Sequence, residues 1–165
     1  FAYADSAFPD DHEQWSFHNV RGGATSDWTG VSMTALNGKP VACVVLGGQL
    51  RYLRSTQTVP TSASHWLDHN VVTSAGRYAS LVITGGVPAI AYTDASFAKP
   101  RPALAWAESA TPAAASDWCL DKYVTDSVPV KYLFMSASTF GGRPFLGFLA
   151  EGPFSSTQTM MMWGN

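Results

Sequence analysis

The densest group of polar side chains in the sequence is the run Asp10, Asp11, His12 and Glu13. Clustered carboxylate oxygens in a loop are ligands that calcium prefers. A calcium loop also needs a glycine at its turn and regularly spaced ligands, and this run has neither. It occupies the place that residues 113–116 take at a corresponding junction later in the chain. We therefore interpret it as a solvated loop, assign no metal-binding residue and expect no cofactor.

Two histidines, His18 and His69, occupy the same place in two copies of a short sequence, and Asn19 and Asn70 follow them. Imidazole is a general base and a metal ligand, so a catalytic or metal-binding pair is one interpretation. Repetition favours a structural role instead, because a repeated residue can make the same contact in each repeat. We expect each histidine to make one hydrogen bond within its own repeat.

Serine stands beside aspartate or histidine at three places. These residue types could form a serine nucleophile and its base, but no Gly-x-Ser-x-Gly elbow accompanies them. Short polar side chains also cap turns by bonding the nearby backbone. We therefore predict capping at these places and assign no catalytic residue. The places are Ser26 with Asp27, Ser64 with His65, and Ser116 with Asp117.

Glycine pairs and scattered arginines have structural explanations as well. No helix with Lys followed by Ser or Thr comes after any glycine pair, so we interpret the pairs as turns and not as phosphate loops. We expect ordinary surface roles for the arginines. The pairs begin at Gly22, Gly47, Gly85 and Gly141, and the scattered arginines include Arg51, Arg54, Arg77, Arg101 and Arg143.

The two cysteines, Cys43 and Cys119, are far apart in the sequence and belong to no Cys-x-x-Cys motif. This arrangement is neither a disulfide framework nor a zinc site. We predict two thiols that are not bonded to each other.

Composition limits the classes of protein to which the chain can belong. Of its 165 residues, 46% are hydrophobic and only 13% are charged, and the net charge is −2. Disorder needs lower hydrophobicity and more charge, and nucleic-acid binding needs a basic surface. No apolar run reaches the roughly 18 residues of a membrane span. There is no signal-peptide pattern at Phe1, so we expect any leader to be absent or removed.

Three tryptophans reveal an internal repeat. Trp15 and Trp66 are 51 residues apart, and Trp66 and Trp118 are 52 residues apart. The residues around them also agree, since Trp-Ser-Phe-His-Asn-Val at the first matches Trp-Leu-Asp-His-Asn-Val at the second. Trp28 breaks the period and is not part of the series. We expect the three periodic tryptophans to lie at equivalent places in the core of successive repeats.

Two further markers follow the same period. A turn sequence ending in proline lies 25, 22 and 26 residues after the tryptophans, at Pro40, Pro88 and Pro144, and an apolar run follows each. Glycine supplies the positive φ of a tight hairpin, and proline at the first position of a strand removes no interior ladder bond. The other marker, Leu-Arg-Tyr-Leu-Arg-Ser at Leu50, recurs as Leu-Ala-Trp-Ala-Glu-Ser at Leu104 and opens the chain as Phe-Ala-Tyr-Ala-Asp-Ser.

Each cycle is predicted to hold four short strands joined by hairpins. In the second cycle we expect strands over 66–73, 78–83, 89–92 and 103–108. No segment carries a helical apolar stripe, and the Ala-rich residues 110–115 are predicted to be a loop. Four strands at a period of about 40–50 residues are typical of β-propeller blades. A parallel β-helix is the rival fold, but it has a shorter period. The fold class is therefore all-β, a propeller of about three blades over 15–55, 66–109 and 118–163, with an extra strand at 1–6.

The pattern of the second cycle, Gly-x-Pro-Ala-Ile-Ala-Tyr, Leu-Ala-Trp-Ala-Glu-Ser and Ser-Asp-Trp, resembles β-propeller blades of large secreted or cell-surface repeat proteins. The resemblance covers nearly the whole chain and implies the architecture rather than a ligand. It implies an extracellular or cell-surface location. The Asp-box motif of sialidase-like blades and the paired motifs of WD40 blades are absent.

We expect a non-enzymatic scaffold for binding or assembly. A carbohydrate-binding propeller with exposed aromatic residues in equivalent grooves is one alternative, and part of a glycosidase with two converging carboxylates is another. Three blades leave two sheet faces bare, since closed propellers hold about 4–8 blades. We expect residues 1–6 to pair with a blade outside this chain, and Thr159–Trp163 to supply the final fourth strand. A second copy or a longer chain would complete the ring.

Overall fold

A computed structural model describes residues 2–4, 15–17, 20, 28–96, 100–122, 131–151 and 157–163. These residues form antiparallel β-strands and two short 3-10 turns, so the described chain is all-β, as predicted. The elements are β1 (Ala2–Ala4), β2 (Trp15–Phe17), β3 (Trp28–Leu36), β4 (Lys39–Leu46), β5 (Gln49–Ser55), η2 (Ala63–His65), β6 (Trp66–Val72), β7 (Ala75–Thr84), β8 (Val87–Asp94), β9 (Arg101–Ala107), η3 (Ala115–Asp117), β10 (Trp118–Lys122), β11 (Lys131–Phe140), β12 (Arg143–Glu151) and β13 (Thr157–Trp163).

The strands form three large sheets and one small pair. Sheet I has the order β3-β4-β5-β6, sheet II has the order β7-β8-β9-β10, and sheet III has the order β11-β12-β13. The remaining pair is β1 with β2. Every neighbouring pair within a sheet is consecutive in the chain, because hairpins of two residues or longer loops join them.

The predicted hairpin turns are confirmed. Asn37 and Gly38 connect β3 to β4, with φ values of 52° and 71°. Two glycines with positive φ connect β7 to β8 and β11 to β12 in the same way. Positive φ at both turn residues matches the right-handed twist of the paired strands. Each marker proline is the second residue of the following strand, one place later than predicted.

The grouping of strands into sheets differs from the expected one. The strand beginning at Trp66 pairs with β5 and closes sheet I, and the strand beginning at Trp118 pairs with β9 and closes sheet II. The tryptophans therefore mark the last strand of a sheet and not the first. The sheets span 28–72, 75–122 and 131–163 instead of the expected 15–55, 66–109 and 118–163. The spacing of the tryptophans gives the length of the repeat but not the residue at which each sheet begins. The spacing alone therefore could not show which strand is the first of a sheet.

The pairing of strands at the two ends of the chain also differs from the expected one. Residues of the opening marker pair with β2 inside the chain, where Ala4 lies opposite Trp15. Ala107 lies opposite Trp118 in the same way. The Met-rich strand β13 was expected to be a fourth strand, but it is the third strand of sheet III. Trp163 in β13 corresponds to Trp106, since they lie opposite Phe145 and Ala89.

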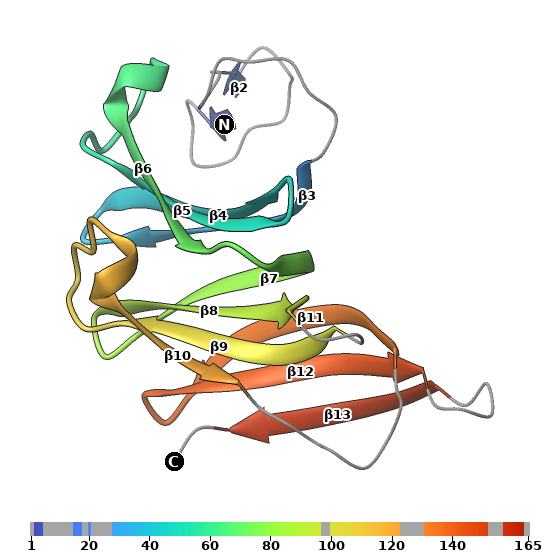
Figure 1. Ribbon diagram of the computed structural model, residues 1–165. Helices are drawn as coiled ribbons and strands as arrows, with labels where there is room; N and C mark the ends of the chain where they lie inside the picture. The colour runs from blue at the N-terminus through green and yellow to red at the C-terminus, as the bar shows by residue number, and fades with distance from the viewer. Residues whose placement is uncertain are drawn as a thin grey trace.

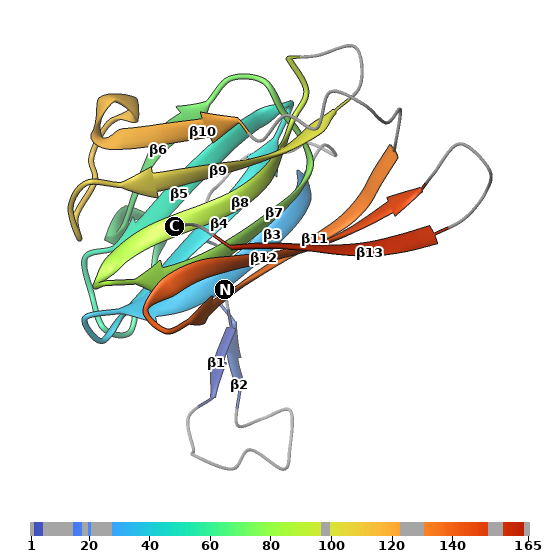
Figure 2. The ribbon, with the colours of Figure 1, turned by 90° about the horizontal axis from the view of Figure 1, so that it is seen from below.

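The three sheets are stacked face to face in chain order (Figures 1 and 2). The first strand of sheet II, β7, packs against both β3 and β11, so the first strands lie together. We call the face of a sheet that is turned toward the preceding sheet its leading face, and the opposite face its trailing face. The largest apolar cluster fills the space between the trailing face of sheet I and the leading face of sheet II. A smaller cluster lies between sheets II and III.

Candidate assembly surfaces

Two of the three serine pairs lie at capped turns as predicted, but His65 and Asp117 accept the backbone N–H groups and the serines do not. His65 Nδ1 accepts a hydrogen bond from the backbone N–H of Thr61, at 3.1 Å. Asp117 Oδ2 accepts the backbone N–H groups of Ala113 and Ala114, at 2.7 and 3.1 Å. These bonds lower the pKa of Asp117. Each capping residue directly precedes the tryptophan that begins β6 or β10, so it fixes the entry into the last strand of its sheet.

His69 makes a hydrogen bond between sheets, and the predicted bond within its own repeat is therefore wrong. Its Nε2 accepts the indole N–H of Trp118, at 3.0 Å. The ring of Tyr52 lies edge-on to both partners, with centroids 5.2 Å from Trp118 and 5.7 Å from His69. His69 lies opposite Tyr52 in the pairing of β5 with β6, on the trailing face. Burial lowers the pKa of His69, which favours the neutral acceptor form.

The residue after His69 does make a bond within its own sheet. Asn70 Oδ1 accepts a hydrogen bond from Arg51 Nη1 at 2.7 Å, and Arg51 Nη2 forms an ion pair with Asp68. This arginine therefore joins β5 to β6 on the leading face of sheet I, which is a more specific role than the surface role predicted. The arrangement is a structural clamp across two strands.

Both cysteines are free, and the prediction that they are not bonded to each other is confirmed. Cys43 lies in β4, and burial raises its pKa to about 12, so the thiol is unreactive at neutral pH. The Cys119 thiol donates to Glu108 Oε1 at 3.1 Å, and this bond raises its pKa.

Several predicted positions lie outside the described residues. They include the polar run at Asp10, Asp11, His12 and Glu13, the pair His18 and Asn19, and Ser26 with Asp27. The backbone of Trp15 begins β2, but its side chain is also outside the description. Within the described ranges, no group of three or more His, Cys, Asp or Glu side chains is placed to hold a metal ion.

The first two strands of the three sheets match position for position. Ser32, Ser80 and Ser136 stand at one position, and a marker proline follows eight residues later in each sheet. Each serine projects from the trailing face, because its cross-strand partner belongs to that face: Cys43, Ala91 and Gly147 respectively. The residue after each serine belongs to the leading face. Counterparts in the three sheets can therefore be compared directly.

A repeated hydrogen bond joins the first strands of consecutive sheets. The Oγ of Ser32 accepts the backbone N–H of Leu81, at 3.0 Å. The Oγ of Ser80 accepts the backbone N–H of Ala137, at 2.9 Å. In both cases the donor is the residue directly after the corresponding serine of the next sheet: Leu81 follows Ser80, and Ala137 follows Ser136. We call this contact the serine clasp. This contact fixes the position of the first strand of one sheet relative to the first strand of the next sheet.

The leading face of sheet I is an end face of the stack, and two of its apolar residues are exposed. Val31 is 72% exposed and Met33 is 42% exposed. Their counterparts in sheet II are Ala79, 8% exposed, and Leu81, 5% exposed, which sheet I covers. The rest of this face is covered within the chain: Ala42, Val44, Leu53 and Trp66 form a buried cluster there, and Val20 packs against it.

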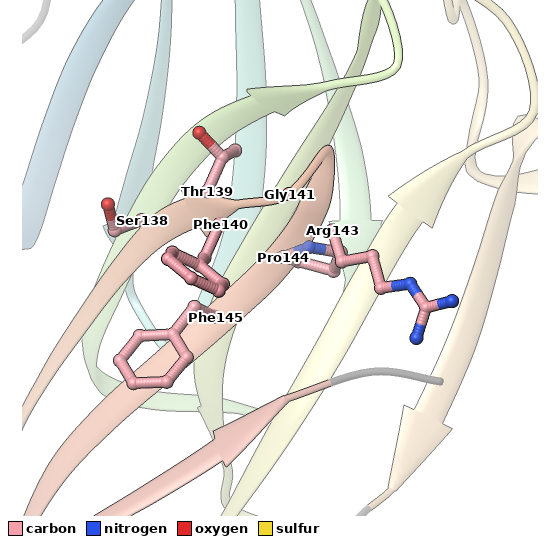
Figure 3. Close-up of a pocket in the computed structure, with 7 residues that line it drawn as sticks. All are labelled: Ser138, Thr139, Phe140, Gly141, Arg143, Pro144 and Phe145. Atoms are coloured by element: carbon pink, nitrogen blue, oxygen red, sulfur yellow. The ribbon is translucent and has the colours of Figure 1, made fainter.

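The trailing face of sheet III is the other end face. Phe140 is 82% exposed there, whereas its counterpart Leu36 is 6% exposed because sheet II covers it. Figure 3 shows Phe140 and Phe145 side by side on one side of the β11–β12 hairpin. They line a pocket of about 890 Å³ with Ser138, Thr139, Gly141, Arg143 and Pro144.

Neither the serine series nor the end-face residues were predicted from the sequence. The signal was present, because the serines stand at a constant distance before the marker prolines. It was too weak to stand out, since serine is common and its acceptor role appears only when two sheets are packed.

No protein-family model matches the chain, and no curated protein matches it at a significant level. No helix among the described residues is both long enough and apolar enough to cross a membrane.

Proposed function

We propose that the chain is a non-enzymatic scaffold of the β-propeller type, in which each sheet is one blade and the end faces bind other sheets. The observation that carries the proposal is the contrast between Leu36 and Phe140. They are counterparts, yet one is 6% exposed and the other 82% exposed. Exposed apolar patches on a sheet mark sites of interaction. The end faces therefore supply the binding surface.

The repeated contacts support the blade interpretation. Sheets I and II have the same strand order, and the serine clasp joins each sheet to the next with the same geometry. Radial repetition of four-stranded sheets, each packing only on its neighbours, is the building principle of propellers. The extracellular location implied by the resemblance belongs to the same proposal.

Four of the described carboxylates support a non-enzymatic role, because each has a structural partner. Asp68 pairs with Arg51, and Glu108 accepts the thiol of Cys119. Asp94 is buried and accepts the backbone N–H of Ser96 at 2.9 Å. Asp117 caps η3. A glycosidase needs two carboxylates that face one substrate, about 5–10 Å apart.

A panel of glycoside and ester substrates tests this proposal. We expect no turnover above the rate of a heat-denatured sample. Turnover that a single substitution abolishes would show that the chain is an enzyme and would overturn the proposal.

Carbohydrate binding remains the alternative, and the pocket beside Phe140 and Phe145 is the feature that favours it, since aromatic rings can stack on sugars. Its counterparts at Leu36 and Thr84 are not aromatic. Binding on a glycan array that F140A abolishes would favour this alternative.

A further inference from the structure

We propose that the contact between His69 and Trp118 is a pH-sensitive latch, which holds the outer strands of sheets I and II together and releases them when His69 takes up a proton. The outer strands are β6 and β10, the last strands of the two sheets. The first strands, β3 and β7, stay packed in the released form. The latch lies between two sheets of one chain, so the inference does not depend on the scaffold function proposed above.

The two sheets are held together differently at their first and last strands. At the first strands, the Oγ of Ser32 accepts the backbone N–H of Leu81, and Gly30 lets β3 approach the backbone of β7 closely. At the last strands, β6 packs against η3, and the indole N–H of Trp118 donates to His69 Nε2 at 3.0 Å. A hydroxyl and a backbone amide do not titrate near neutral pH, but an imidazole does. A proton can therefore break the bond at the last strands and leave the first strands in place.

Only the neutral form of His69 can make the bond to Trp118. A neutral imidazole has one nitrogen that accepts a hydrogen bond, whereas both nitrogens of the protonated ring carry hydrogens, and the indole nitrogen can only donate. Protonation therefore places two donors 3.0 Å apart, and repulsion replaces attraction. The closed contact and the proton exclude each other, which gives this interface two alternative states.

The indole of Trp118 fills the outer part of the space between the sheets. It is 6% exposed and packs edge-on against Tyr52, which is fully buried. Among the residues that β9 and β10 contribute to the described apolar cluster, Trp118 is the large one, and the others are Ala103, Ala105 and Ala107. Loss of its hydrogen bond therefore weakens the contact at the last strands as a whole and uncovers an aromatic surface.

The groups around His69 keep it neutral in the closed form. Burial has the largest effect and lowers its pKa, two carboxylates oppose this effect, and two arginines add to it. The phenol of Tyr52 is neutral, because burial raises its pKa. The carboxylates are Asp117 at the end of η3 and Asp68 on β6, and the arginines are Arg51 and Arg54 on β5.

A falling pH favours the released form. In that form the ring of His69 is exposed and takes up a proton near the ordinary pKa of about 6.5, whereas the pKa in the closed form is lower. The released form therefore binds the proton more tightly, and its share of the chains grows as the pH falls below about 6.5. One proton is linked to the transition, so the ratio of released to closed chains rises by at most about tenfold for each pH unit.

Hydrogen exchange measured by mass spectrometry at about pH 7.5 and about pH 5.5 tests the latch, with rates corrected for intrinsic exchange at each pH. In the parent chain we expect the protection of peptides from β6 and β10 to fall at least about fivefold at the lower pH. Peptides from β3 and β7 should keep their protection within about twofold, because their contacts do not titrate in this range.

Two substitutions separate His69 from the other histidines. H69Q keeps a side chain that can accept the indole N–H and does not titrate, so its β6 and β10 should be equally protected at both pH values. H65Q is the matched control, since His65 lies directly before β6 but accepts the backbone N–H of Thr61 in its own turn. H65Q should show the same fall in protection as the parent.

Three results would overturn the inference. One is equal protection of β6 and β10 at both pH values in the folded parent, and another is the same fall in H69Q as in the parent. The third is an equal fall in β3 and β7, which would show that the whole fold loosens. If H69Q does not fold, an NMR titration of the parent decides: the indole N–H resonance of Trp118 must shift with the midpoint of the His69 ring protons, and an indole resonance that does not follow them contradicts the latch.

Discussion

Trp118 and His69 show how single residues hold two sheets together. The indole N–H of Trp118 has its acceptor on the neighbouring sheet, and both rings pack against Tyr52, which is fully buried. Buried aromatic residues with one polar atom need such a partner. The periodic tryptophan was correctly predicted to be a core residue at Trp66 and Trp118, which are 8% and 6% exposed. The partner of its N–H was not predictable, because it depends on how two sheets pack.

The substitution W118F should destabilise the fold by about 1–2 kcal/mol, because it leaves His69 Nε2 without its donor and removes part of a buried ring. Urea unfolding of the parent, W118F, H69F and the double variant measures this effect. We expect a coupling energy of about 1 kcal/mol between the two residues. A coupling near zero would show that the bond contributes nothing to stability.

The pH dependence of stability follows from the same pair. Burial lowers the pKa of His69 below its ordinary value, and the neighbouring arginines, Arg51 and Arg54, act in the same direction, while Asp117 and Asp68 oppose it. The unfolded chain therefore takes up a proton at a higher pH than the folded chain does. The stabilisation is complete above the unfolded pKa of about 6.5 and is lost as the pH falls toward the folded pKa.

Urea unfolding at several pH values between about 8 and 5 tests this dependence. The free energy of unfolding of the parent should fall more steeply below pH 7 than that of H69N, and the difference removes the contribution of the other histidines. Parallel curves for the two proteins would contradict the assigned role of His69.

At the scale of the element, strands and hairpins were predicted well because their signals are local. Glycine at the turn and alternation along the strand depend on a few neighbouring residues. The assignment of β6 and β10 to a sheet depends instead on pairing between strands. Trp66 lies eleven residues after the end of β5 and nine before the start of β7, so distance along the chain did not decide its partner. The trailing end face was missed for the same reason.

Gly30 lies where sheets I and II come closest. It sits at a bulge in β3 with a φ of +67°, and an added Cβ would lie 2.6 Å from the backbone oxygen of Arg77 in β7. Backbone cannot move aside as a flexible side chain can. The contact indicates that β3 and β7 approach closely because this position lacks a side chain.

The substitution G30A should cost about 2–4 kcal/mol, which combines positive φ with overpacking between strands. G38A is the matched control, since Gly38 has a φ of +71° but nothing within 4 Å of an added Cβ. It should cost only about 1 kcal/mol. Chemical denaturation measures both, and equal costs would show that the approach of the two strands does not matter for stability.

At the scale of the whole molecule, apolar side chains are exposed on the first and the last of the three large sheets that the structure describes. The resemblance to propeller blades predicted that two sheet faces would be uncovered. The structure identifies the exposed apolar residues on these faces, because each can be compared with a counterpart that a neighbouring sheet covers. Phe140 is exposed, whereas its counterpart Leu36 belongs to the apolar core between sheets I and II.

Sedimentation equilibrium of the chain at micromolar concentration tests the central claim most directly. We expect a mass larger than that of one chain, and we expect V31D and F140D to shift the equilibrium at least tenfold toward the monomer. V59D is the matched control, since Val59 is 48% exposed but lies in the loop between β5 and η2, outside the strands that carry Val31 and Phe140. It should behave as the parent does. A stable, well-folded monomer that neither end-face substitution alters would contradict the claim that the end faces bind other sheets.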